Sequence, residues 1–171
     1  MTEVPTVVVV MGVSGCGKST VGHLLAQRLG VPFLEADDVH PASNRAKMAA
    51  GRPLDDEDRR PWLLSVAAWI REATDDGQGG VVACSALKYA YREVFRGAGA
   101  GVWILYLALD RTTADRRVAE RVGHFMPAGL VDSQYAALEP LRPDEPGLTV
   151  AAVADPRTIV DQAERALRAA R

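Results

Sequence analysis

The chain has 171 residues, with 20 basic and 22 acidic side chains and a formal net charge of -2. Its length fits one domain with a full core. Its composition, with 48% hydrophobic and 25% charged residues, argues against a wholly disordered or collagen-like chain. The near-neutral balance argues against nucleic acid or an anionic membrane as the partner. We therefore expect a single domain over residues 1–171 that binds any anion through a local cluster of cations.

Cysteine usage and the N-terminus bear on location. The two cysteines, Cys16 and Cys84, have no CxxC spacing, so neither a zinc site nor a disulfide framework is indicated. An acidic residue stands where a signal peptide carries positive charge, and the first apolar run is too short to span a bilayer. A cytoplasmic location is the expectation.

Short runs of β-branched residues alternate along the chain with segments of helical period. Strands are predicted at residues 6–11, 31–36, 80–85, 102–109 and 148–154. Between them, apolar residues follow a 3.6-residue period within 21–29, 62–73 and 159–167. Five buried strands separated by helices predict an α/β fold with a parallel sheet. Trp62 and Trp69 are interpreted as packing residues of the second helix.

Two polar stretches interrupt this alternation. Residues 37–61 are punctuated by proline, with a short helix predicted over 41–50 and Gly51 as its stop. Residues 122–147 contain a predicted helix around 130–138, bracketed by glycine and proline. In a small parallel-sheet domain, such insertions are expected to form substrate arms and lids.

The first predicted strand runs directly into GVSGCGKS, a complete G-x4-G-K-[ST] phosphate loop that is followed by an amphipathic helix. In such a loop the backbone N–H groups surround a β-phosphate, the lysine reaches the β and γ oxygens, and the hydroxyl ligates Mg²⁺. The residues predicted to bind the nucleotide are Gly12, Ser14, Gly15, Cys16, Gly17, Lys18, Ser19 and Thr20. Cys16 is interpreted as a small filler without a redox role.

The loop by itself leaves open whether the nucleotide serves a switch, a motor or a transfer reaction. The sequence has neither the NKxD motif of a GTPase nor an LSGGQ-like segment of an ABC-type ATPase. Its third predicted strand ends in Cys84 and Ser85, where a Walker B aspartate is usual. These features argue against a GTPase switch and an ABC-type motor.

Carboxylates follow the second predicted strand, at Glu35, Asp37 and Asp38. Strand alternation places Glu35 and Asp37 on one side, and the carboxyl ends of parallel strands share one edge of the sheet. We therefore predict that Asp37 accepts a hydroxyl proton from the acceptor substrate and that Glu35 holds Mg²⁺ water. The alternative that these acids cap the helix beginning near Pro41 stays open, most of all for Asp38.

Cations gather near the same expected edge. The only three lysines, against 17 arginines, are Lys18, Lys47 and Lys88. With Arg45, Arg52 and Arg92 they are predicted to form a pocket for a small carboxylate or phosphate substrate. A solvated surface role stays open for Lys47.

A pair of arginines, Arg117 and Arg121, stands four residues apart on the helix that leads into the second insertion, so both point to one face. From a lid hinge they can swing onto the transferring phosphoryl group. Surface ion pairs with Asp115 or Glu120 are the alternative.

These motifs together resemble the gluconokinases, small P-loop kinases that phosphorylate gluconate on its 6-hydroxyl with ATP. The similar segments are MGVSGCGKST, EADDVHP, GRPLDDEDR with PWL, CSALK and RVGHFMP. The resemblance covers residues 1–140, and residues 141–171 are similar only in pattern. Glu35 departs from the family, in which relatives often carry Asp.

The resemblance implies a three-layer P-loop kinase fold whose five-stranded parallel sheet has the order 2-3-1-4-5, with 37–61 as substrate arm and 122–147 as lid and following helix. It implies ATP and Mg²⁺ as cofactors, with Ser19 and Glu35 as the residues of the metal site. The catalytic residues it implies are Lys18, Asp37, Arg117 and Arg121. The substrate contacts expected on this basis are Asp37, His40, Arg45, Lys47, Arg52, Ser85, Lys88, Arg92 and His124.

The expected activity is therefore phosphorylation of gluconate. The alternatives are a shikimate-kinase-like transfer to another small hydroxy-carboxylate, and a regulatory protein that binds a nucleotide without catalysis. Whether the chain forms a homodimer is left open.

Overall fold

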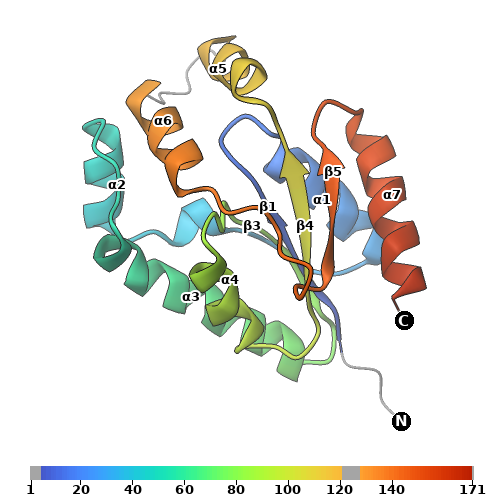
Figure 1. The fold of residues 1–171 in the computed structure, drawn as a ribbon. Helices are drawn as coiled ribbons and strands as arrows, with labels where there is room; N and C mark the ends of the chain where they lie inside the picture. The colour runs from blue at the N-terminus through green and yellow to red at the C-terminus, as the bar shows by residue number, and fades with distance from the viewer. Residues whose placement is uncertain (1–4, 121–127, 171) are drawn as a thin grey trace.

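Five parallel strands form the centre of the computed structural model, which describes residues 5–120 and 128–170 (Figure 1). The strands are β1 (Val7–Met11), β2 (Phe33–Glu35), β3 (Gly80–Ala83), β4 (Val102–Ala108) and β5 (Gly147–Ala151). Their order across the sheet is β2-β3-β1-β4-β5, and every neighbouring pair is parallel. The predicted strands and strand order are confirmed.

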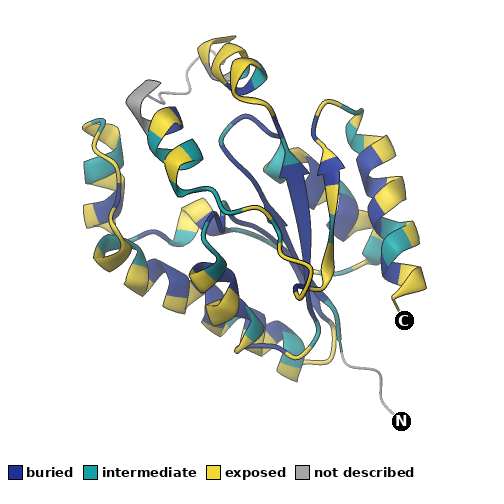
Figure 2. Ribbon diagram, viewed as in Figure 1, coloured by how far each residue is buried: buried dark blue, intermediate teal, exposed yellow. Residues whose placement is uncertain are grey.

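Helices cover both faces of this sheet. One face packs against α1 (Lys18–Leu29) and α7 (Pro156–Ala169), and the other against α3 (Asp56–Asp75) and α4 (Tyr89–Arg96). Every residue of β1 is completely buried, because alternate side chains enter the two cores (Figure 2). No helix within the described ranges is long and apolar enough to cross a membrane.

The first insertion begins where β2 ends. A 3₁₀ helix η1 (Ala36–Val39) is followed by α2 (Ala42–Ala49), and Gly51 ends this unit with a left-handed φ of 78°. The predicted short helix and its glycine stop are confirmed. Pro41 is the N-cap of α2 and makes no side-chain capping hydrogen bond, and Asp38 lies within η1. The capping role considered for Asp38 is therefore wrong.

Helix α3 begins earlier than its apolar period indicates. Asp55 accepts a hydrogen bond from the N–H of Asp58 at 2.7 Å, and the Asp58 carboxylate accepts from the N–H of Asp55 at 3.0 Å. This capping box starts the helix before Pro61, so the first turn is polar and projects from the core.

The second insertion lies between α5 (Arg111–Glu120) and β5, and contains α6 (Ala128–Ala137). Figure 1 shows α2, α5 and α6 around the end of the sheet toward which the strands point. The two insertions therefore surround the carboxyl edge, where ligands bind in open α/β sheets.

Candidate active site

The phosphate loop has the backbone geometry that its glycines predict. Gly12 has φ 152°, and a Cβ built there would lie 2.6 Å from Cys16 Sγ and 2.9 Å from the Leu107 carbonyl oxygen. Gly17 is the left-handed N-cap of α1, with φ 94°. The Gly12 N–H donates to the Ser85 carbonyl at 3.2 Å, which ties the loop to the segment after β3. The loop is thus held at the N-terminus of α1, where an anion is favoured.

Lys18, Ser19 and Glu35 meet beside this loop. Lys18 Nζ donates to the Val13 carbonyl at 3.1 Å, and the Ser19 hydroxyl donates to the Glu35 carboxylate. Burial raises the pKa of Glu35, while the Ser19 hydrogen bond opposes this shift, Asp37 adds to it and Lys18 opposes it. A hydroxyl and a carboxylate at one point form the hard oxygen donor set that suits Mg²⁺.

Asp37 is exposed and lies on η1, so the strand alternation used to orient it is wrong beyond Glu35. It nevertheless lies close enough to act electrostatically on Glu35 and on Cys84. The pKa of the Cys84 thiol is raised to about 12, chiefly by burial, so this cysteine remains a thiol. The structure places the predicted acceptor carboxylate at the same edge as the phosphate loop.

His40 is mostly core. The residue is 7% exposed, its ring lies stacked on Trp62 with centroids 4.2 Å apart, and its Nδ1 is 3.2 Å from Asn44 Nδ2. Burial lowers the pKa of His40 and favours the neutral ring. This packing corrects the expectation of a pocket side chain, since His40 instead joins η1 to α2 and α3.

Two of the three predicted lysines, Lys47 and Lys88, lie at the first turn of α3. Lys47 Nζ lies 2.5 Å from Asp58 Oδ2, and Lys88 Nζ lies 2.8 Å from Asp56 Oδ1. These partners raise the pKa values of both lysines, which stay charged. The structure therefore brings two ammonium groups from distant segments to one helix end.

Further side chains complete this region. Tyr91 donates its hydroxyl to Asp56 and receives a hydrogen bond from Arg59 at 3.0 Å. Arg45 donates to the Asp38 carbonyl at 2.5 Å, and Arg52 is exposed in the segment between α2 and α3. Sequence reasoning missed Arg59 and Tyr91 as residues of this region. The only sequence signal for the start of α3, where these side chains meet, was the capping residue Asp55.

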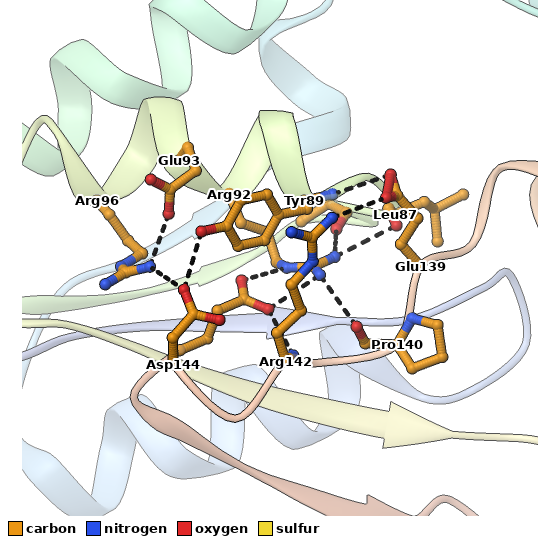
Figure 3. Close-up of polar contacts among 11 residues, drawn as sticks. Leu87, Tyr89, Arg92, Glu93, Arg96, Glu139, Pro140, Arg142 and Asp144 are labelled. Carbon is orange, nitrogen blue, oxygen red and sulfur yellow. Dashed lines mark hydrogen bonds and ion pairs between the residues drawn. The ribbon is translucent and has the colours of Figure 1, made fainter.

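The prediction that Arg92 lines the pocket is wrong. Its side chain is fully buried, and it donates to both carboxylate oxygens of Glu145 at 2.7 and 3.1 Å (Figure 3). Its other donors reach the carbonyls of Ala86, Leu87 and Pro140. Because these bonds occupy its donors inside the protein, Arg92 has no free N–H for a substrate.

Helices α5 and α6 each contact the phosphate loop. Arg117 donates to the Gly15 carbonyl at 3.0 Å and to the Ala152 carbonyl at 3.3 Å. Gln134 accepts from the Ser14 N–H at 2.7 Å and donates to the Ser14 hydroxyl at 3.3 Å. Arg117 thus lies at the phosphate loop, while its contact with the transferring phosphoryl group stays a prediction. The contact of Gln134 was not anticipated.

Two predicted residues, Arg121 and His124, lie outside the described part of the chain. The described site therefore consists of the phosphate loop, Glu35 with Asp37, the lysines at the start of α3, and the contacts from α5 and α6.

Comparisons with known proteins agree with this arrangement. The Shikimate kinase family model matches residues 14–134. A gluconokinase of Gluconobacter oxydans (strain 621H) is 43% identical over 165 residues, covering 96% of this chain and 93% of that protein. Among solved structures, an unliganded sugar kinase from Janibacter sp. HTCC2649 has a TM-score of 0.91 at 43% identity, covering 96% of this chain and 95% of that one.

A gluconokinase from Sinorhizobium meliloti 1021 has a TM-score of 0.87 at 37% identity, covering 97% of this chain and 93% of that one. Sequence similarity and fold thus extend together over nearly the full length of these relatives. The chain therefore belongs to the Shikimate kinase family of that model and to the gluconokinases.

Proposed function

We propose that the protein transfers the γ-phosphoryl group of ATP to the 6-hydroxyl of gluconate, giving 6-phosphogluconate and ADP. The observation that carries this proposal is one sheet edge holding a complete phosphate loop and an exposed carboxylate at Asp37, together with the ammonium groups of Lys47 and Lys88 at the first turn of α3. These are the parts that phosphoryl transfer to a small anionic alcohol requires.

The nucleotide end of the reaction belongs to the loop and α1. The backbone N–H groups of the loop bind the phosphates, and Lys18 moves from the Val13 carbonyl to their oxygens. Ser19 and Glu35 would hold Mg²⁺, which supplies charge neutralisation for the β- and γ-phosphates when bound. Arg117, already bonded to Gly15, steadies the loop from α5.

The acceptor end belongs to η1 and the start of α3. Asp37 takes the hydroxyl proton as the acceptor oxygen attacks phosphorus. The gluconate carboxylate binds Lys47 and Lys88, replacing part of their pairing with Asp58 and Asp56. Both ion pairs are partly solvated, so this exchange of carboxylates is inexpensive.

A second acceptor class is favoured by one finding, the match of the Shikimate kinase family model. Such an enzyme would use the same loop and carboxylate on a cyclic hydroxy-carboxylate.

Release of ADP, measured by a coupled assay with gluconate, shikimate, glycerate and nucleoside monophosphates in turn, tests these candidates. Gluconate alone should give rapid turnover, with the product phosphorylated at the 6-position by ³¹P NMR. Preference for shikimate would reassign the acceptor. Slow hydrolysis that no acceptor stimulates would show a nucleotide-binding protein without transfer activity.

A further inference from the structure

The buried ion pair between Arg92 and Glu145 plays no direct part in the proposed reaction. Both side chains have no exposed surface, and they join α4 to the segment that precedes β5. Removing two charges from water is expensive, and an apolar pair of similar volume is often as stable. The pair is therefore better explained by what its hydrogen bonds orient than by stability alone.

The groups that Arg92 orients belong to the turn between β3 and α4. One Arg92 nitrogen donates to the Ala86 carbonyl at 2.9 Å and to the Leu87 carbonyl at 3.3 Å. Ala86 is completely buried and has a left-handed φ of 46°, the only positive φ among the non-glycine residues that the structure describes. An alanine stays in this conformation only when its surroundings hold it there.

This strained turn separates two parts of the site. Before it, the Ser85 carbonyl accepts the Gly12 N–H of the phosphate loop. After it, Lys88 is the N-cap of α4 and directs its ammonium group toward Asp56. The conformation of Ala86 therefore sets the position of Lys88 relative to the phosphate loop.

The segment of residues 139–145, which carries Glu145, makes further hydrogen bonds to the same turn. Figure 3 shows these contacts around Tyr89. The Glu139 N–H donates to the Leu87 carbonyl at 2.7 Å, and the Tyr89 hydroxyl donates to Asp144 at 2.9 Å. Glu145 itself is oriented by the Arg142 N–H at 2.8 Å. The buried pair is the innermost part of a clamp on residues 86–89.

We propose that Arg92 and Glu145 are positioning residues for the acceptor side of phosphoryl transfer. They hold the left-handed turn at Ala86, which presents Lys88 to the substrate carboxylate at a fixed distance from the phosphate loop. This inference rests on the proposed function for its substrate, but its structural part does not.

The test uses Arg92→Lys, which keeps the buried charge and loses the planar fork, and Glu145→Gln, which keeps the shape and loses the charge. Leu167→Ala is the matched control, because it removes buried side-chain volume on α7, within the core on the other face of the sheet. The KM for gluconate, kcat and the Kd for ATP are measured for each variant at a temperature where it is folded.

We expect the gluconate KM to rise by about tenfold or more in both clamp variants, with the ATP Kd unchanged within about threefold. The control should alter neither constant at a comparable loss of thermal stability. Equal changes for gluconate and ATP, or the same profile as the control, would overturn the inference and leave the pair a structural element.

A double-variant cycle examines the proposed link to Ala86. Glycine adopts the left-handed conformation freely, so the effect of Arg92→Lys on the gluconate KM should be smaller in the Ala86→Gly background. Additive effects would mean that Arg92 does not act through this turn.

Hydrogen exchange separates this inference from the proposed function, because it needs no substrate. In the clamp variants the amides of residues 84–89 should exchange faster, while those of β1 keep their protection. Uniformly faster exchange would refute the positioning role. Absence of gluconate turnover in the wild-type protein would instead refute the proposed function. The exchange result would then decide by itself whether Arg92 and Glu145 hold the turn at Ala86.

Discussion

Trp62→Phe tests how the core of the protein supports the two carboxylates of the site. The Trp62 indole is 2% exposed, and its Nε1 donates to the Ala36 carbonyl at 2.7 Å. Ala36 is fully buried between Glu35 and Asp37. Phenylalanine keeps most of the ring that stacks on His40 but removes this donor.

The lost hydrogen bond sets the least loss expected, because the smaller phenyl ring also leaves buried volume unfilled. A buried carbonyl left without its partner costs about 1–3 kcal/mol, and the central value of about 2 kcal/mol is appropriate here because the bond is short and wholly enclosed. For a chain of this length, about 2 kcal/mol lowers the Tm by roughly 4–8 °C.

Thermal unfolding followed by circular dichroism, together with urea denaturation, measures this effect. Leu64→Ala is the control on the same helix, because Leu64 is 59% exposed and its truncation should change stability by less than about 0.5 kcal/mol. A Tm for Trp62→Phe within about 1 °C of wild type would show that the Ala36 carbonyl does not depend on Trp62, and the reasoning would fail.

Four further changes address the chemistry and the pH dependence. Lys18→Ala should keep the fold and lower turnover by roughly a hundredfold or more, and turnover retained within about threefold would refute the phosphate-loop role. Asp37→Asn should lower kcat strongly with ATP affinity nearly unchanged, whereas loss of ATP binding with kcat preserved would make Asp37 a nucleotide or metal ligand.

Burial raises the folded-state pKa of Glu35, so its ionised form opposes folding at pH values above the ordinary pKa of 4.5. Glu35→Gln should therefore raise the Tm at neutral pH while lowering Mg²⁺-dependent turnover. A lower Tm for this variant would contradict the expected sign. Burial lowers the folded-state pKa of His40, so the unfolded chain takes up the proton first as the pH falls below 6.5. The wild type should therefore lose stability below this pH relative to His40→Phe. Parallel curves of Tm against pH for the two proteins would contradict this prediction.

The local patterns of the sequence predicted much of the fold. The apolar run of β1, the phosphate loop and the helical period of α7 are each contained in a few consecutive residues, and the structure has them where the sequence indicated. The strand order was implied by the family resemblance, and the structure confirms it. The start of α3 was missed because its first turn is polar and its capping box outweighs Pro61.

Tertiary structure decided which chemically capable side chains face the site. Arg92 and Lys88 both follow β3 in sequence, yet Arg92 is enclosed with a carboxylate 53 residues away, while Lys88 meets Asp56 at the partly solvated start of α3. His40 became part of the core because Trp62 covers its ring.

Composition and spacing determined that this chain would be an α/β protein with a phosphate loop at a strand end, because those features depend on neighbouring residues alone. The role of each arginine, histidine and glutamine depended instead on which distant carboxylate, carbonyl or ring the folding of the whole chain brought beside it. Sequence spacing does not reveal such long-range partners. These partners determine whether a charged or polar side chain is buried.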